Sequence, residues 1–263
     1  MMLAGFDRRD MHMLYNLFRM NLSDRFLGSS LGMAWAVLAP LTLMATFTFV
    51  FTFVFPGRLP GQDGSLPFVI WLISGYGPWL AISEGLATAT GSVVANAGVV
   101  KNIAFKSELL PIMGALLGLV PLAVALVTIL VLQIVSGSVP VLGYFMLPLA
   151  LALHLLFVAG VGLFLGALNV FLRDTALALP NVLTVMLFVS PIFYALSSYP
   201  AKLRPLLQFN PFYVIAECYR QPLLHGAMPP LWMVVCLAPL PTGVFRGGLG
   251  GSRRLNSFFD PRL

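Results

Sequence analysis

The stretch MAWAVLAPLTLMATFTFVFTFVF, residues 33–55, decides the fold. It holds 23 residues without a charge, and from Thr46 onward a phenylalanine stands at every second position. Alternation with period two is typical of a β-strand, but a membrane-barrel strand needs only about 9–11 residues with a polar residue at every second place. Here the alternating partners are threonine and valine, and an isolated strand would leave its backbone unpaired in hydrocarbon. The stretch therefore predicts a transmembrane α-helix. At 100° per residue, the phenylalanines then form two rows on opposite faces, namely Phe47, Phe51 and Phe55 against Phe49 and Phe53.

The composition of the whole chain excludes an ordinary soluble protein. Of 263 residues, 59% are hydrophobic and only 9% are charged, and the mean hydropathy is +0.93. A soluble domain carries about 25% charged residues, so this chain must use lipid as its solvent. Its net charge of +6 fits basic cytoplasmic loops, and we expect no nucleic-acid partner. Cys218 and Cys236 show no metal or redox spacing and are expected to be inert, unpaired thiols.

Six apolar runs predict an all-α, polytopic membrane protein with six transmembrane helices. The expected spans are residues 33–55, 68–94, 109–135, 144–172, 176–196 and 231–245. The sixth run has 15 residues and two internal prolines, and it would reach about 22 Å across a hydrocarbon core of roughly 30 Å. That span is therefore thin, tilted or defective, and a disrupted reading frame would also explain it. The domain organisation follows: residues 1–32 form a cytoplasmic amphipathic segment, 33–245 the membrane domain and 246–263 a cytoplasmic tail.

Basic residues predict the orientation of these spans. Eleven lysines and arginines fall on one predicted side of the membrane and four fall on the other. Because basic loops stay in the cytoplasm, both termini are expected to be cytoplasmic. Before the first span, residues 7–26 form an expected amphipathic helix, whose apolar stripe is Met11, Leu14, Tyr15, Phe18 and Leu22. This helix either lies on the inner membrane surface or simply packs against the spans.

Residues that would carry catalysis are scarce. None of the three lysines belongs to a phosphate-binding P-loop, so any ATP must be hydrolysed by another chain. The three histidines match no metal or nucleophile pattern, and we expect no catalytic residue, metal or cofactor in this chain. His154 lies mid-span and is expected to be neutral and hydrogen-bonded to a neighbouring helix. Glu84, also at membrane depth, binds a cation or caps a kink.

Four stretches together resemble the bacterial ABC-type polysaccharide export permeases, the type-2 exporter family that moves O-antigen, capsular polysaccharide or teichoic acid. They are RFLGSSLGMAWAVLAPL (25–41), NAGVVKNIAFKSELLP (96–111), GALNVFLRDT (166–175) and SPIFYALSSYPAKLRPLLQFNPFYVIAECYRQPLLHG (190–226). Lys106 departs from the family, which usually has proline there. The resemblance implies a homodimer in the bacterial inner membrane, joined to two copies of an ABC ATPase that hold ATP and Mg and drive export of a lipid-linked polysaccharide.

The resemblance also implies two sites. Contact with the ATPase is expected from the amphipathic helix and the loop after the second span, through Arg19, Arg25, Asn96, Lys101, Lys106 and Glu108. For the lysines, simple anchoring on the positive side is the alternative. Residues 197–226 are too apolar for an ordinary loop, and they predict short re-entrant helices at an external gate containing Asn210, Pro211, Glu217 and Arg220. The last two, three residues apart, are expected to pair with each other rather than to bind sugar.

Aromatic side chains suggest how a polymer would move. Sugars present apolar C–H faces that stack on rings, and weak repeated contacts suit a chain that must slide. We expect the translocation path to be lined by Phe47, Phe51, Phe55, Tyr76 and Trp79. In the alternative, the phenylalanines face lipid or pack between helices. Three other functions stay open: a permease for a drug or lipid, a membrane-embedded glycosyl or acyl transferase, and a proton-coupled carrier.

Overall fold

The computed structural model describes residues 7–54, 65–98 and 106–237, together with residues 243, 245–248 and 250. Within these ranges the chain forms helices and turns and no strand, which confirms the all-α prediction. The helices are α1 (Arg8–Asp24), η1 (Gly32–Ala34), α2 (Trp35–Phe49), η2 (Val50–Val54), α3 (Ser65–Ala95), α5 (Leu109–Leu117), α6 (Leu119–Ser136), α7 (Val141–Tyr144), α8 (Leu147–Phe171), α9 (Asp174–Val189), η3 (Leu196–Ser198), α10 (Arg204–Gln208), α11 (Pro211–Arg220), η4 (Gln221–His225) and α12 (Leu231–Leu237).

Four helical segments are long and apolar enough to cross a membrane. They are Gly32–Val54, Ser65–Ala95, Leu109–Ser136 and Val141–Phe171, and each coincides with one of the first four predicted spans. The phenylalanine-rich stretch is therefore a helix rather than a strand as far as Val54. Its last turn, η2, has the wider π-helical form.

Helix α3 is the centre of the bundle, packing against α5, α6, α8, α9 and α11. Small residues allow its backbone to approach its neighbours closely, as is usual between membrane helices. A Cβ at Gly114 of α5 would lie 2.5 Å from the Cα of Ala89 on α3. Similarly, a Cβ at Gly162 of α8 would lie 2.7 Å from the Cβ of Ala89. Helices α3, α5 and α8 are thus in direct backbone-level contact.

The fifth predicted span is shorter than the sequence analysis expected. Helix α9 ends at Val189, not near residue 196, and has 16 residues. Ser190 is extended (φ −80°, ψ 145°), because the following proline disfavours helical geometry in the residue before it. The apolar run continues through Pro191, so hydrophobicity alone did not reveal the break.

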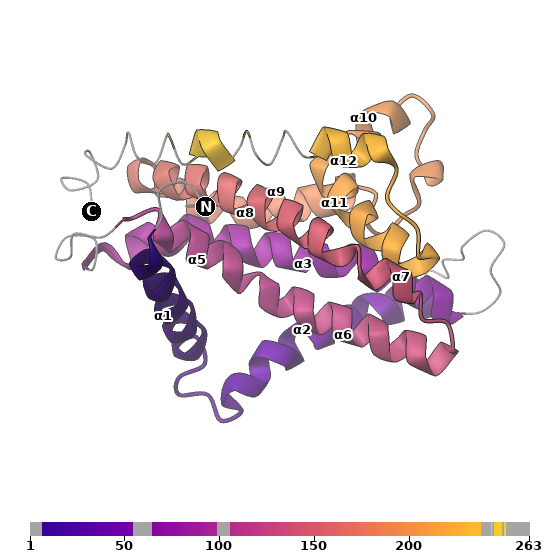
Figure 1. Cartoon of the computed structure of the whole chain (residues 1–263), viewed down its shortest axis with the longest axis horizontal. Helices are drawn as coiled ribbons and strands as arrows, with labels where there is room; N and C mark the ends of the chain where they lie inside the picture. Colours follow the sequence, from indigo (N-terminus) through magenta and orange to yellow (C-terminus); the bar gives the residue numbers. More distant parts are fainter. Residues whose placement is uncertain are drawn as a thin grey trace.

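The sixth predicted span is described only in part. Helix α12 covers Leu231–Leu237, while residues 238–242 and 244 lie outside the described residues. The predicted short external helices are α10, α11 and η4, and α11 packs against α3 and α8. Figure 1 shows α10, α11 and α12 gathered at one end of the bundle, with α1 at the opposite end.

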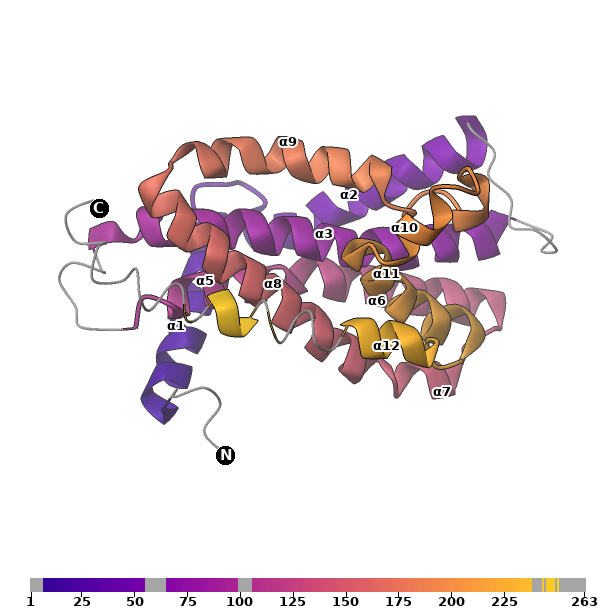
Figure 2. The same ribbon diagram turned by 90° about the horizontal axis from the view of Figure 1, so that it is seen from above.

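Helix α1 runs across the bundle rather than along it in both views (Figures 1 and 2). Leu14 is buried against Leu109, Met113 and Leu117, three residues of α5. The predicted apolar stripe is therefore divided: Leu14, Phe18 and Leu22 pack in this cluster, while Met11 and Tyr15 are exposed. Packing thus accounts for one edge of the stripe, and the other edge is exposed.

Candidate functional site

An aromatic cluster joins α2, α3 and the segment after α9. Phe193 lies at its centre, with ring centroids 4.6 Å from Phe47, 5.0 Å from Phe51 and 5.3 Å from Tyr76. Phe47 also contacts Tyr76 edge to face at 4.8 Å. The structure therefore brings together three of the residues that the sequence assigned to a path, and it adds Phe193.

The two phenylalanine rows have opposite environments, as the helical interpretation predicted. Phe51 is only 7% exposed, whereas Phe53, two residues later, is 73% exposed. Within each row the rings touch, with centroids 6.4 Å apart for Phe47 and Phe51 and 5.5 Å apart for Phe49 and Phe53. Phe55 lies outside the described residues. One row thus faces the cluster, and the other is exposed.

Trp79 does not join this cluster. Its ring packs edge to face on Phe212 of α11, at 5.2 Å, and Phe157 contacts Phe212 from α8. Phe193 was missed because it lies inside the predicted fifth span, which was expected to continue as a helix to residue 196, whereas α9 ends at Val189. The available signal was an aromatic pair, Phe193 and Tyr194, two residues after a proline inside an apolar run.

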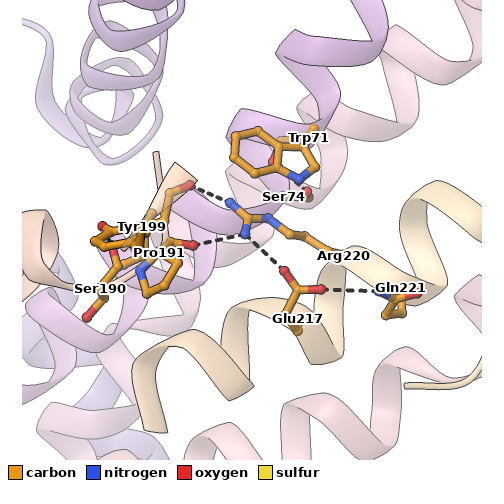
Figure 3. A network of polar contacts seen from close by, with 9 residues as sticks. Trp71, Ser74, Ser190, Pro191, Tyr199, Glu217, Arg220 and Gln221 are labelled. Atoms are coloured by element: carbon orange, nitrogen blue, oxygen red, sulfur yellow. Dashed lines mark hydrogen bonds and ion pairs between the residues drawn. The ribbon is translucent and has the colours of Figure 1, made fainter. Parts of the chain in front are cut away.

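A buried arginine organises the end of the bundle that carries α11 (Figure 3). Arg220 is 2% exposed, and its Nη1 pairs with Glu217 Oε1 at 3.1 Å, which confirms the predicted pair. The same Nη1 donates to the carbonyl oxygen of Pro191 at 3.1 Å, and Nη2 donates to that of Ile192. Its Cζ lies 4.0 Å from the centroid of the Trp71 ring. The guanidinium is thus enclosed by α3, α11 and the chain after α9.

The other two predicted gate residues lie beside this network. Asn210 caps α11, since its Oδ1 accepts from the backbone N–H of Phe212 at 2.9 Å. Its Nδ2 donates to Ser190 Oγ at 3.0 Å, so it also contacts the break after α9. Pro211 occupies the first position of α11, where its lack of an N–H costs nothing. All four residues of the predicted gate therefore lie beside the break after α9.

At the opposite end, an ion pair fixes α1 to the start of α5. Lys106 Nζ lies 2.6 Å from Asp10 Oδ2, and the backbone N–H of Asp7 donates to the same oxygen at 2.8 Å. These hydrogen bonds, that of Lys106 first, lower the pKa of the Asp10 carboxyl below its ordinary value. Lys106 thus has a specific ion-pair partner, in addition to its predicted place on the side of the membrane that is rich in basic residues.

A second polar contact connects the end of α1 to α3. Arg25 pairs with Glu84 and donates to Thr88 Oγ1 at 3.3 Å, while Thr88 Oγ1 donates to Glu84 at 3.2 Å. Glu84 therefore binds an arginine cation. Together with Trp35 and Pro40, the charged pair lines a cavity of about 220 Å³ between α1, α2, α3 and α6.

The remaining predicted ATPase contacts are separated. Arg19 is exposed on α1, and Asn96 donates to the carbonyl of Ser92 at 2.8 Å, within its own helix end. Glu108 is buried directly before α5. Lys101 lies outside the described residues. The structure thus joins Lys106 to α1 and Arg25 to α3 but does not assemble all six residues into one contact.

Among the described residues, no group of three or more His, Cys, Asp or Glu side chains could hold a metal ion. His154 is buried on α8, with its Nδ1 3.4 Å from the Tyr219 hydroxyl of α11, as expected for a histidine bonded to a neighbouring helix. Cys218 is a free, buried thiol, as predicted. The geometry is that of packed helices around aromatic and paired charged groups.

The comparisons with known proteins agree with this geometry. The family model described as ABC-2 type transporter matches residues 13–224. The chain is 24% identical to the O-antigen export system permease protein RfbA of Klebsiella pneumoniae over 209 residues, covering 79% of this chain and 78% of that protein. It is 25% identical to RfbA of Myxococcus xanthus over 228 residues, covering 86% and 85%. It is likewise 25% identical to the polysialic acid transport protein KpsM of Escherichia coli over 215 residues, covering 80% of each. The chain belongs to the ABC-2 type transporter family of membrane proteins.

Proposed function

We propose that the chain is the membrane permease subunit of an ABC exporter that moves a lipid-linked polysaccharide, of the O-antigen or capsular type, across the bacterial inner membrane. Its family membership and its relatives, named as O-antigen and polysialic acid transport proteins, support this function. ATP hydrolysis belongs to a separate ABC ATPase chain, bound in two copies with its ATP and Mg. This chain itself is a transport subunit and not an enzyme.

Family membership carries the proposed function, and the aromatic cluster around Phe193 carries the proposed path of the polymer. Aromatic rings bury large apolar area and need no fixed hydrogen-bond partner, so they suit the C–H faces of a sliding sugar chain. Phe47 of α2 contacts Tyr76 of α3 directly, and Phe51 of η2 reaches the cluster through Phe193, on the flank where Figure 2 shows α2 and α9 beside α3. We place the path of the polymer along this flank, between two copies of the chain in a homodimer.

Coupling to the ATPase would take place at the other end of the bundle. Helix α1 is attached to α5 through Asp10 and Lys106 and to α3 through Arg25 and Glu84. A partner that pushes on α1 would therefore move two spans together. This end carries Arg8, Arg9 and Arg19 in addition, and basic loops remain inside, so we place it and both termini in the cytoplasm.

A matched pair of variants tests the function. In a host that lacks its own copy of this chain, the wild-type chain and its ATPase are expected to restore polysaccharide at the cell surface. Phe51→Leu keeps most of the buried volume but removes a ring of the cluster, so export per amount of membrane-inserted protein should fall severalfold. The control Phe53→Leu changes an exposed ring and should export normally.

Two outcomes would overturn the proposal. Surface polysaccharide that does not depend on the chain would exclude polymer export and favour a drug or lipid as the substrate. Failure to co-purify an ABC ATPase in mild detergent would exclude the exporter assembly. Equal export by Phe51→Leu and Phe53→Leu would remove the aromatic cluster from the path while leaving the transport function in place.

A further inference from the structure

The carbonyl groups at the break after α9 need partners. A helix end leaves its last carbonyls without intrahelical donors, and burying such groups unpaired is costly. Ser190 turns the chain out of the helix, and Pro191 has no N–H to continue it. Arg220 of α11 donates to the carbonyls of both Pro191 and Ile192. An arginine 28 residues beyond Ile192 in the sequence therefore supplies hydrogen bonds to two carbonyls of this break.

The guanidinium of Arg220 has little freedom to move. Trp71 covers one face of it at 4.0 Å, and Glu217 pairs with its edge. Gly75, one turn after Trp71 on α3, supplies the space that it occupies. A Cβ at Gly75 would lie only 2.7 Å from the Cζ of Arg220, and nearer still to its Nη2. The site is thus shaped for a planar cation, with Trp71 and Gly75 both contributed by α3. Figure 3 shows the Trp71 ring beside the guanidinium.

The residue that follows Ile192 is the centre of the aromatic cluster. Phe193 contacts Phe47, Phe51 and Tyr76, and Phe188 of α9 contacts it at 6.2 Å. Phe193 is 2% exposed and Ile192 is fully buried. A shift of the Ile192 carbonyl would move the Phe193 ring, since the two are adjacent in a segment outside any helix.

We propose that Arg220 is a positioning residue that holds Phe193 in the aromatic cluster and thereby keeps the cluster closed. With Arg220 bonded to the break, the ring of Phe193 fills the space between α2 and α3, and the path is shut at this level. Release of the two carbonyls would let residues 190–193 leave the cluster. The assignment rests on the proposed function only in treating the cluster as part of the translocation path.

A cysteine reporter tests this assignment without removing the ring. Ile192→Cys is made in a chain carrying Cys218→Ala and Cys236→Ala, and a small, membrane-impermeant maleimide is applied to intact cells. The reporter should be protected when Arg220 is present. Arg220→Gln should raise labelling by about tenfold or more, because two hydrogen bonds from a charged group are lost. Arg220→Lys, which keeps the charge but not the planar fork, should give an intermediate value.

Matched controls separate positioning from general damage. Arg204→Gln removes another arginine that bonds carbonyls in the same segment, those of Ser197 and Tyr199, and it should leave the reporter protected. Gly75→Ala displaces the guanidinium without removing any polar group, and it should expose the reporter as Arg220→Gln does. Gly91→Ala on the same helix meets nothing within 4 Å and should have no effect.

The outcomes decide between the possibilities. If Arg220→Gln does not reach the membrane, the comparison of Gly75→Ala with Gly91→Ala still tests whether displacing the guanidinium exposes the reporter. The proposal would be overturned if the reporter stayed protected in Gly75→Ala. It would also be overturned if Arg204→Gln or Gly91→Ala raised labelling as much as Arg220→Gln does. The labelling needs no transport, so a wild-type chain that exports no polysaccharide would refute the proposed function and leave this result standing.

Discussion

The two ends of the bundle both use ion pairs, in opposite environments. At the α1 end, the side chains of Arg25 and Glu84 are 40% and 33% exposed, and Lys106 is 38% exposed while its partner Asp10 is 12% exposed. At the α11 end, Arg220 is 2% exposed and bonded to two backbone carbonyls as well as Glu217. Exposed pairs typically stabilise by only about 0–1 kcal/mol, whereas breaking a buried pair costs about 3–5 kcal/mol. Rearrangement should therefore cost less free energy at the α1 end than at the α11 end.

The largest expected effect is the loss of Arg220. Arg220→Gln leaves Glu217 and two carbonyls buried without their cation, and it should lower the free energy of unfolding by about 3–5 kcal/mol. Arg25→Gln, its counterpart at the other end, should cost no more than about 1 kcal/mol. Thermal unfolding of the purified variants in mild detergent measures both. Equal losses would contradict the contrast between the ends.

The next effect concerns the aromatic cluster beside Arg220. Phe193→Ala removes a buried ring with four aromatic neighbours and should cost about 3 kcal/mol or more. Phe53→Ala changes an exposed ring and should stay within about 0.5 kcal/mol. The same unfolding measurement compares them, and a large loss for Phe53→Ala would show that the exposed row is buried in the assembled protein.

A smaller effect is expected from the Asp10–Lys106 pair. A double-mutant cycle with Asp10→Asn and Lys106→Gln should give a small favourable coupling, well below the loss expected from Arg220→Gln. The coupling should shrink as salt rises from about 0.1 M to about 1 M, because salt screens the partly exposed ammonium group of Lys106. A coupling as large as the loss from Arg220→Gln, and insensitive to salt, would place this pair in the same class as Arg220.

The smallest effect is the pH dependence of that pair. Because the pKa of Asp10 is lowered in the folded chain, its stabilising contribution is fully present above the ordinary pKa of 3.8 and is lost as pH falls through the lowered value. The stability difference between wild type and Asp10→Asn should thus be constant from about pH 7 to about pH 5 and disappear only under more acidic conditions. A difference that already fades near pH 6 would point to another group.

Much of the fold follows from the sequence because long apolar runs without charges permit few structures in lipid. The helical form of residues 33–54 and the Glu217–Arg220 pair depend on short-range rules, and both were predicted. The predicted end of the fifth span was wrong because hydrophobicity continues past Pro191. The role of Phe193 was missed because the predicted fifth span was expected to run past it. The Asp10–Lys106 contact was missed because it joins residues far apart in the chain. Periodicity predicted two phenylalanine rows but not which of them faces the protein. The exposed fractions of Phe51 and Phe53 in the structure show that the row of Phe51 does.

The glycine contacts of α3 have a consequence for how this protein could change shape. Helices that touch through Gly114, Gly162 and Ala89 have no side chains between them to re-pack, so they resist sliding past one another. Helices α3, α5 and α8 should therefore travel as a single rigid body. Only 17% of the most apolar part of the segment Gly32–Val54 is buried, against 67% for α3, so this segment can shift while disturbing far less packing. A change of shape in this chain should therefore move α2 relative to the block of α3, α5 and α8.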